Sequence, residues 1–224
     1  MLNETWSKFS NCSINVNLDD HEIFEFQLIG SKIFALRDNP VTDKVAMFDT
    51  RRTEMGWTWL PSLNRAGSFS FNWIINHGGV LYVFDLRDKY YECYNEELKQ
   101  WTCVKPENWP ASIDTDASLV SHDGLIYATC TSYTDMTMKE FYSFDPTSAT
   151  WKRLANFLSK PLDHFLLSLG NSLIKLHPAF YEIYDIEDNK TWETIEVDDR
   201  GMSLWSPCIV NKSLLDKSHE CNKI

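Results

Sequence analysis

Apolar residues in this chain occur in short runs separated by turn residues, and four stretches repeat the same order of runs. In each stretch, a first apolar run, a turn with Gly or Asn and a second apolar run precede a variable loop. An aromatic-rich run then ends in an aromatic residue, and a Trp follows seven to nine residues later. Tight hairpin turns need positive φ, which Gly and Asn adopt readily. Because a helical periodicity of 3.6 residues is nearly absent, the pattern predicts short antiparallel strands.

The closing aromatic residues recur at a spacing of 46, 50 and 40 residues, at Phe48, Tyr94, Phe144 and Tyr184. The Trp residues that follow them are Trp57, Trp101, Trp151 and Trp192. Four short strands in a repeat of this length are typical of β-propeller blades. An unrepeated β-sandwich, whose strands are alike only in composition, is the alternative.

The repeat predicts an all-β fold and one domain over residues 1–224. We expect blades at about 22–60, 69–104, 115–154 and 163–195, with partial-blade strands at 3–9 and 204–215. The four full blades and two partial ones would form an open arc. Such an arc would leave apolar side chains exposed at its ends, around Ile29 and Ile33 and around Ile209 and Leu214, so the isolated chain should self-associate.

Two segments resemble the kelch repeat. Residues 57–65 (WTWLPSLNR) are similar to the W-x-x-L-P-x-M-x-x-x-R segment that links kelch blades, and 144–151 (FDPTSATW) are similar to the Y-D-P-x-T-x-x-W that ends a blade. The two glycines that usually follow the second strand of a kelch blade are replaced in all four copies, for example by Asp85-Leu86. The chain therefore resembles a degenerate kelch-type propeller.

Charge and targeting features exclude several classes of function. The net charge of −11 disfavours a nucleic-acid partner. The chain shows neither a signal-peptide pattern nor an apolar stretch of the ~20 residues that a membrane helix needs. Its 6 cysteines include no CxxC pair, which is typical of a reduced compartment. We expect a cytoplasmic protein with no membrane partner.

Residues that could carry chemistry form no recognisable motif. No nucleophile motif, phosphate-binding loop or paired-carboxylate pattern is present, and the six histidines have no metal-ligand spacing. Cys93 and Cys103 lie on adjacent predicted strands and are interpreted as small core residues. We therefore predict no enzyme, no catalytic residue, no cofactor and no metal.

The kelch resemblance implies a non-catalytic protein-interaction module. Many similar propellers follow BTB and BACK domains and act as substrate receptors of cullin-RING ubiquitin ligases. The chain contains no BTB or BACK segment, so contact with a cullin complex would need segments absent here. One alternative is an actin-associated kelch protein. A secreted, glycan-active propeller of the sialidase or oxidase type is the alternative from another class, and the N-x-[ST] sequons at Asn189 and Asn211 would suit it.

The predicted partner-binding surface consists of the loops that kelch-like propellers present on one face. The loops within blades are 37–44, 85–90, 131–139 and 176–180, and the linkers between blades are about 61–70, 105–116, 155–164 and 196–204. The candidate residues are Arg37, Asp38, Arg87, Asp88, Trp109, Asp114, Asp116, Tyr133, Asp198, Asp199 and Arg200. The acidic surplus among them predicts a protein partner with exposed basic residues.

Overall fold

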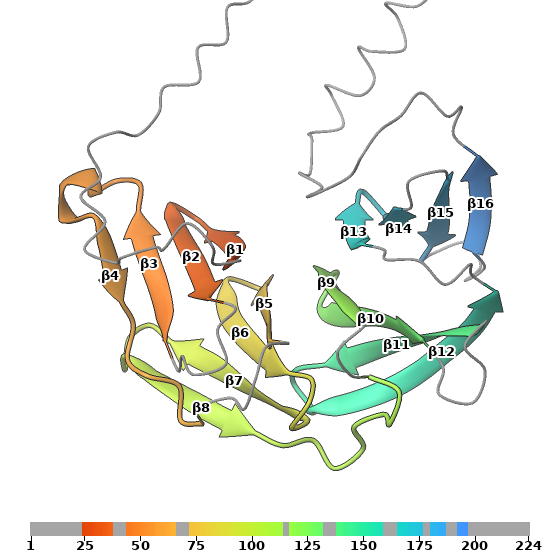
Figure 1. The fold of residues 1–224 in the computed structure, drawn as a ribbon, viewed down its shortest axis with the longest axis horizontal. Helices are drawn as coiled ribbons and strands as arrows, with labels where there is room; N and C mark the ends of the chain where they lie inside the picture. Colours follow the sequence, from red (N-terminus) through yellow and green to blue (C-terminus); the bar gives the residue numbers. More distant parts are fainter. Residues whose placement is uncertain are drawn as a thin grey trace, which may run out of the picture. The chain divides into compact units, whose positions relative to one another are not determined.

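The computed structural model describes residues 24–37, 44–65, 72–113, 117–131, 138–158, 165–176, 180–186 and 192–196. These residues form four four-stranded antiparallel sheets, and in each sheet the strands that follow one another in sequence are neighbours (Figure 1). This meander is the blade of a β-propeller, so the predicted fold class is confirmed. The partial-blade strands predicted at 3–9 and 204–215 lie outside the described residues.

The strands have the following bounds. Blade 1 contains β1 (Phe24–Ile29), β2 (Lys32–Arg37), β3 (Val45–Asp49) and β4 (Trp57–Trp59), with the short 3-10 helix η1 (Thr53–Met55) before β4. Blade 2 contains β5 (Asn72–His77), β6 (Val80–Asp85), β7 (Tyr90–Asn95) and β8 (Gln100–Val104). Blade 3 contains β9 (Ser118–His122), β10 (Leu125–Thr131), β11 (Met138–Asp145) and β12 (Thr150–Leu158). Blade 4 contains β13 (Phe165–Leu169), β14 (Ser172–Leu176), β15 (Phe180–Asp185) and β16 (Trp192–Glu196).

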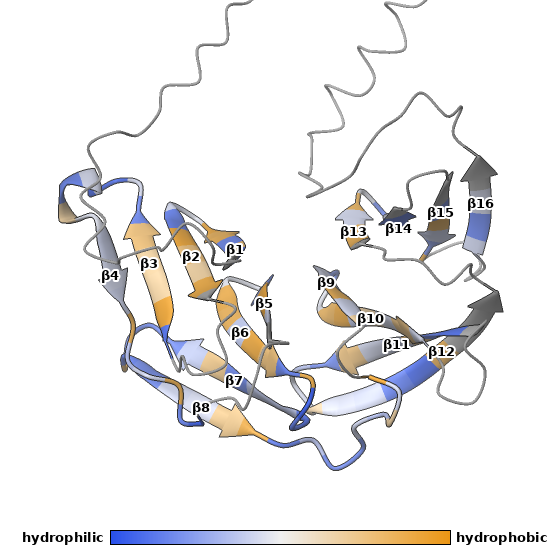
Figure 2. Cartoon of the chain, in the orientation of Figure 1, coloured by the Kyte–Doolittle hydropathy of each residue, from blue (hydrophilic) through white to orange (hydrophobic). Residues whose placement is uncertain are grey.

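The chain divides into two compact units after Glu107, the first with blades 1 and 2 and the second with blades 3 and 4. In the first unit, Phe34, Val45, Leu81 and Tyr94 belong to a core built from both blades. The core of the second unit includes Tyr127, Phe141, Leu166, Leu173 and Tyr184. In Figure 2, β2, β3 and β6 are largely hydrophobic, whereas the turns at the strand ends are hydrophilic. Each unit is therefore held together by burial of apolar side chains between two sheets.

The four repeat tryptophans occupy equivalent places in the fourth strands of the blades. Each lies directly opposite the closing aromatic residue of its own repeat, in the pairs Phe48–Trp57, Tyr94–Trp101, Phe144–Trp151 and Tyr184–Trp192. The ring centroids of these pairs are 4.8 to 5.5 Å apart. Such cross-strand aromatic pairs stabilise antiparallel sheets. Because the same pair recurs in all four blades, the predicted equivalence of the four tryptophans is confirmed.

Side chains of the first strand of one blade bind the backbone of the first strand of the next blade in the same unit. Glu25 and Gln27 of β1 accept hydrogen bonds from the N–H groups of Ile74 and Asn76, at 3.1 and 3.4 Å. In the second unit, the Ser118 hydroxyl oxygen accepts the Leu166 N–H at 2.9 Å. Edge strands leave N–H groups without ladder partners, and these contacts satisfy them where two blades meet.

Candidate partner-binding surface

Each blade has two ends that differ in structure. The tight turns that join the first strand to the second, and the third to the fourth, lie at one end, which we call the turn end. The loop between the second and third strands and the linkers between blades lie at the opposite end, which we call the loop end. Antiparallel order alone fixes this division. The candidate binding residues that the structure describes, Arg37, Arg87, Asp88 and Trp109, belong to loop-end segments.

The β6–β7 loop of blade 2 is a rigid turn built around Asp85. The Asp85 side chain is buried, and its Oδ1 accepts the Asp88 N–H at 2.8 Å. The Asp85 carbonyl oxygen accepts the Lys89 N–H at 3.0 Å, and Lys89 adopts a φ of 60°. Burial raises the pKa of Asp85, and the Asp88 N–H works in the opposite direction. The turn presents Arg87 and Asp88 to solvent.

The linker that enters blade 2 is fixed by a second buried carboxylate. Glu92 is 1% exposed and accepts the N–H groups of Asn64 and Arg65 at 2.8 and 3.0 Å, as well as the Asn64 Nδ2 at 2.8 Å. Asn64 Nδ2 also donates to the Trp101 carbonyl oxygen at 2.8 Å. These bonds hold Arg65 over the ring of Tyr90, with its guanidinium carbon 5.2 Å from the ring centroid. Arg65 therefore joins Arg87 and Asp88 at the loop end of blade 2 as an exposed, well-positioned side chain.

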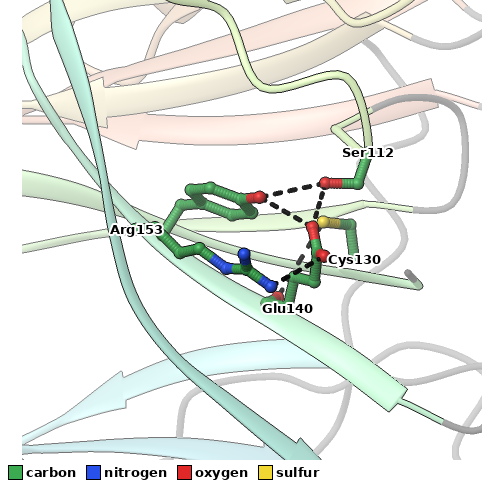
Figure 3. Close-up of polar contacts among 5 residues, drawn as sticks. Ser112, Cys130, Glu140 and Arg153 are labelled. Atoms are coloured by element: carbon green, nitrogen blue, oxygen red, sulfur yellow. Dashed lines mark hydrogen bonds and ion pairs between the residues drawn. The ribbon is translucent and has the colours of Figure 1, made fainter. Parts of the chain in front are cut away.

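The linker that enters blade 3 is held in a similar way (Figure 3). The buried Glu140 side chain accepts hydrogen bonds from Ser112, from the Tyr142 hydroxyl at 2.6 Å and from Arg153 Nη2 at 3.0 Å. The Cys130 thiol donates to the Glu140 carbonyl oxygen at 3.8 Å. Burial, followed by the hydrogen bond to Glu140, raises the pKa of Tyr142 to about 12. The buried Glu140 carboxylate thus accepts three side-chain donors, and one of them, Ser112, belongs to the linker. This hydrogen-bond network holds the linker against blade 3.

The structure places three of the predicted binding residues in full. Arg87 and Asp88 are exposed, whereas Trp109 is half-buried, donates its Nε1–H to the Ile113 carbonyl oxygen at 3.2 Å and packs edge-on against Trp151. Arg37 is the last residue of β2. Seven other candidates lie outside the described residues, namely Asp38, Asp114, Asp116, Tyr133, Asp198, Asp199 and Arg200.

Arg65 and Tyr90 were not among the candidates predicted from sequence. Tyr90 lies in the loop 85–90 and Arg65 in the linker 61–70, so both belong to the predicted surface, although other residues were named as its candidates. Arg65 is also the last residue of the segment that resembles the kelch pattern. Its partners Glu92 and Tyr90 are more than 20 residues away in sequence. The arginine of this segment was the available signal for a residue at the loop end.

Other residues considered for chemistry have packing roles. His122 Nδ1 lies 2.7 Å from the Ser168 hydroxyl, and the His77 ring meets the Tyr82 ring edge-on. Cys93 lies opposite Thr102 and Cys103 lies opposite Glu92, so the two thiols are on opposite faces of blade 2. Both cysteines are free and half-buried. Within the described ranges, no group of three or more His, Cys, Asp or Glu could hold a metal ion.

No family profile matches the sequence, and no curated protein shows significant similarity to it. Among the residues that the structure describes, no helix is long and apolar enough to cross a membrane. The fold class therefore comes from the strand arrangement itself.

Proposed function

We propose that this chain is a non-catalytic protein-interaction module that binds its partner at the loop end of the blades. The observation that carries the proposal is the group of Arg65, Arg87 and Asp88 at the loop end of blade 2, which we call the loop-end surface. Its backbone is fixed by the buried carboxylates of Asp85 and Glu92. Rigid scaffolds that present exposed loop residues are common binding surfaces, and Arg is enriched among binding hot spots.

The charges at the loop end suggest the chemistry of the partner. Arg65 and Arg87 are suited to carboxylate groups, which a guanidinium binds with two parallel hydrogen bonds. The exposed Asp88 of the same surface is suited to a Lys or Arg of that partner. We therefore propose a protein partner of mixed surface charge.

The kelch resemblance narrows the proposal to a cytoplasmic, kelch-like adaptor of the cullin-RING type. The chain would supply the substrate-binding part, and BTB and BACK segments would supply the contact with the cullin. Affinity capture of the full-length protein from its own cells, followed by mass spectrometry, tests this role. Recovery of BTB proteins and a cullin together is the expected result, whereas recovery of actin alone would support the actin-associated alternative.

Substitutions at the two ends of the first unit test the binding surface. Once a partner is identified, Arg65→Ala and Arg87→Ala should each weaken binding by about tenfold or more, as expected for anchor residues. Arg51→Ala is the matched control, because Arg51 is an exposed arginine at the turn end of blade 1. Thermal unfolding of each variant checks that the fold is retained. If the two loop-end variants bind like wild type while Arg51→Ala does not, the binding surface lies at the turn end.

A further inference from the structure

A hollow of about 290 Å³ lies at the turn end of blades 1 and 2, away from the loop-end surface. Lys32 at the start of β2, Asp49 at the end of β3 and Arg52 beside η1 line its blade 1 side. Glu96 and Lys99, from the turn between β7 and β8, line its blade 2 side. Both blades belong to the first compact unit, so the walls of the hollow are held by one core.

The two carboxylates at the hollow already have partners. Asp49 Oδ1 accepts the Ser31 hydroxyl at 3.2 Å and the Arg51 N–H at 2.9 Å. The hydrogen bond from the Arg51 N–H is the main reason why the pKa of Asp49 is lowered, so this carboxylate is ionised at neutral pH. Glu96 forms an ion pair with Lys32 across the two blades. Neither carboxylate needs a further cation.

Two cations at the hollow form no ion pair within the described part of the chain, although the charge of Arg52 helps to lower the pKa of Asp49. The Arg52 guanidinium and the Lys99 ammonium are exposed and make no hydrogen bond or ion pair with any other residue that the structure describes. Together with Lys32 they give three positive charges against the two carboxylates. The hollow therefore carries an excess of one positive charge on a chain of net charge −11, which suits a ligand group with a single negative charge.

The remaining walls suit a small apolar group beside that charge. Met47 and Met55 line the hollow, and Met55 is 65% exposed. Methionine side chains are flexible and polarizable, so they adapt to different aliphatic ligands. The volume is just below the usual range of pockets for drug-sized molecules. It therefore suits a single residue that carries both an apolar side chain and a carboxylate, which is the C-terminal residue of a polypeptide.

We propose that this hollow binds the free C-terminus of a polypeptide whose last residue is apolar. The α-carboxylate lies between Arg52 and Lys99, and the last side chain lies against Met47 and Met55. An internal Asp or Glu fits less well, because successive side chains of an extended chain point in opposite directions. This site is independent of the function proposed for the loop-end surface, since it lies at the other end of the blades.

Titration of the full chain with short fluorescent peptides at low salt tests the proposal. The probe is an acetylated Gly-Ser-Gly-Ser-Leu peptide with a free C-terminus. Its C-terminal amide, and an amidated peptide with an internal Glu, are the comparisons. The free acid should bind more tightly than both, and added salt should weaken its binding. Equal affinity for the free acid and the amide would overturn the proposal, and tighter binding of the internal-Glu peptide would overturn the assignment to a C-terminus.

Substitutions at the hollow complete the test. Arg52→Ala should weaken binding of the free acid by about fivefold, the upper range for an exposed ion pair. Lys99→Asn should have a similar effect, and Asn tolerates the φ of 53° at this position. Arg51→Ala is again the control, because Arg51 neighbours Arg52 but does not line the hollow. If Arg51→Ala weakens binding as much as Arg52→Ala, general attraction to the turn end explains the binding and the site is wrong.

Discussion

At the scale of single residues, the most unusual feature is a buried ion pair inside blade 4. Lys175 and Glu182 lie opposite each other on β14 and β15, with Nζ 2.9 Å from Oε2, and both side chains are almost completely buried. Burial lowers the pKa of Lys175, and the hydrogen bond that Lys175 donates to Glu182 opposes that shift. The pair is therefore sensitive to the removal of either partner.

We expect Glu182→Leu to destabilise the chain strongly. The substitution leaves Lys175 buried without its carboxylate, which costs about 3–5 kcal/mol of unfolding free energy in comparable sites. The double variant Lys175→Met with Glu182→Leu should recover most of that loss, because no charge remains to be desolvated. Urea unfolding of the three proteins measures both effects. A single variant as stable as wild type would mean that the ion pair contributes nothing.

A second residue-scale prediction concerns alkaline pH. Burial raises the pKa of Tyr91 from its ordinary value of 10 to about 12, and nearby Cys93 and Tyr82 add to the shift. Between these two pH values, the unfolded chain loses the Tyr91 proton while the folded chain keeps it. The folded state then binds more protons, so stability falls as pH rises from 10 to 12.

Urea midpoints measured between pH 8 and pH 12 check this dependence, with tyrosinate absorbance as a second readout. Tyr91→Phe cannot ionise at this position, so its stability should fall less steeply with pH than that of wild type. If the two proteins lose stability in parallel, Tyr91 ionises as easily in the folded state as in the unfolded one.

At the scale of elements, buried carboxylates tie the linkers to the blades that they enter. Glu92 of β7 holds Asn64 and Arg65, and Glu140 of β11 holds Ser112. In both linkers an Asn amide also binds the carbonyl oxygen of the repeat Trp of the following blade, from Asn64 to Trp101 and from Asn108 to Trp151. The repeat therefore extends beyond the strands to the way in which successive blades are connected.

We expect Glu92→Gln to loosen the linker into blade 2. A glutamine keeps one acceptor oxygen where the carboxylate has two, and its NH₂ group faces the backbone N–H of Asn64 or Arg65. Leaving buried donors unsatisfied costs about 1–3 kcal/mol. Hydrogen exchange at the two linker amides should become faster and the melting temperature should fall. Glu97→Gln, at an exposed turn position, is the control and should change neither.

The sequence predicted the elements better than it predicted the site. Phe144 and Trp151 are seven residues apart, so a local turn is enough to place them side by side. The residues of the loop end depend on distant partners, since Arg65 is fixed by Glu92 and Tyr90. Trp109 is of a residue type that often anchors binding partners. However, its ring packs against Trp151 and its Nε1–H donates to the Ile113 carbonyl oxygen. The hollow is lined by residues of two blades, so no local sequence pattern indicates it.

At the scale of the whole molecule, blade 1 exposes an apolar sheet face. Phe26 and Leu28 of β1 are 53% and 60% exposed, and Trp59 lies in the same cross-strand row as Phe26 with 41% of its surface exposed. The sequence predicted exposed apolar residues around Ile29 and Ile33. Ile33 is half-buried and pairs with Leu28 on this face, whereas Ile29 is partly buried against the core of the first unit. Successive side chains of a strand point to opposite faces. Phe26 and Leu28 therefore lie on the exposed apolar face, whereas Ile29 lies on the face that packs against the core.

We expect this face to cause self-association of the isolated chain. Contiguous exposed apolar surface is unusual on a monomer and favours contact with a second copy. The double variant Phe26→Thr with Leu28→Thr removes most of that surface and keeps residues that suit a strand. Sedimentation velocity over a range of protein concentrations should show oligomers for wild type and a larger monomer fraction for the variant. Leu98→Thr is the matched control, because Leu98 is 65% exposed in the turn between β7 and β8 and lies outside the face. Its sedimentation should equal that of wild type, and a wild-type chain that is monomeric at every concentration would contradict the prediction.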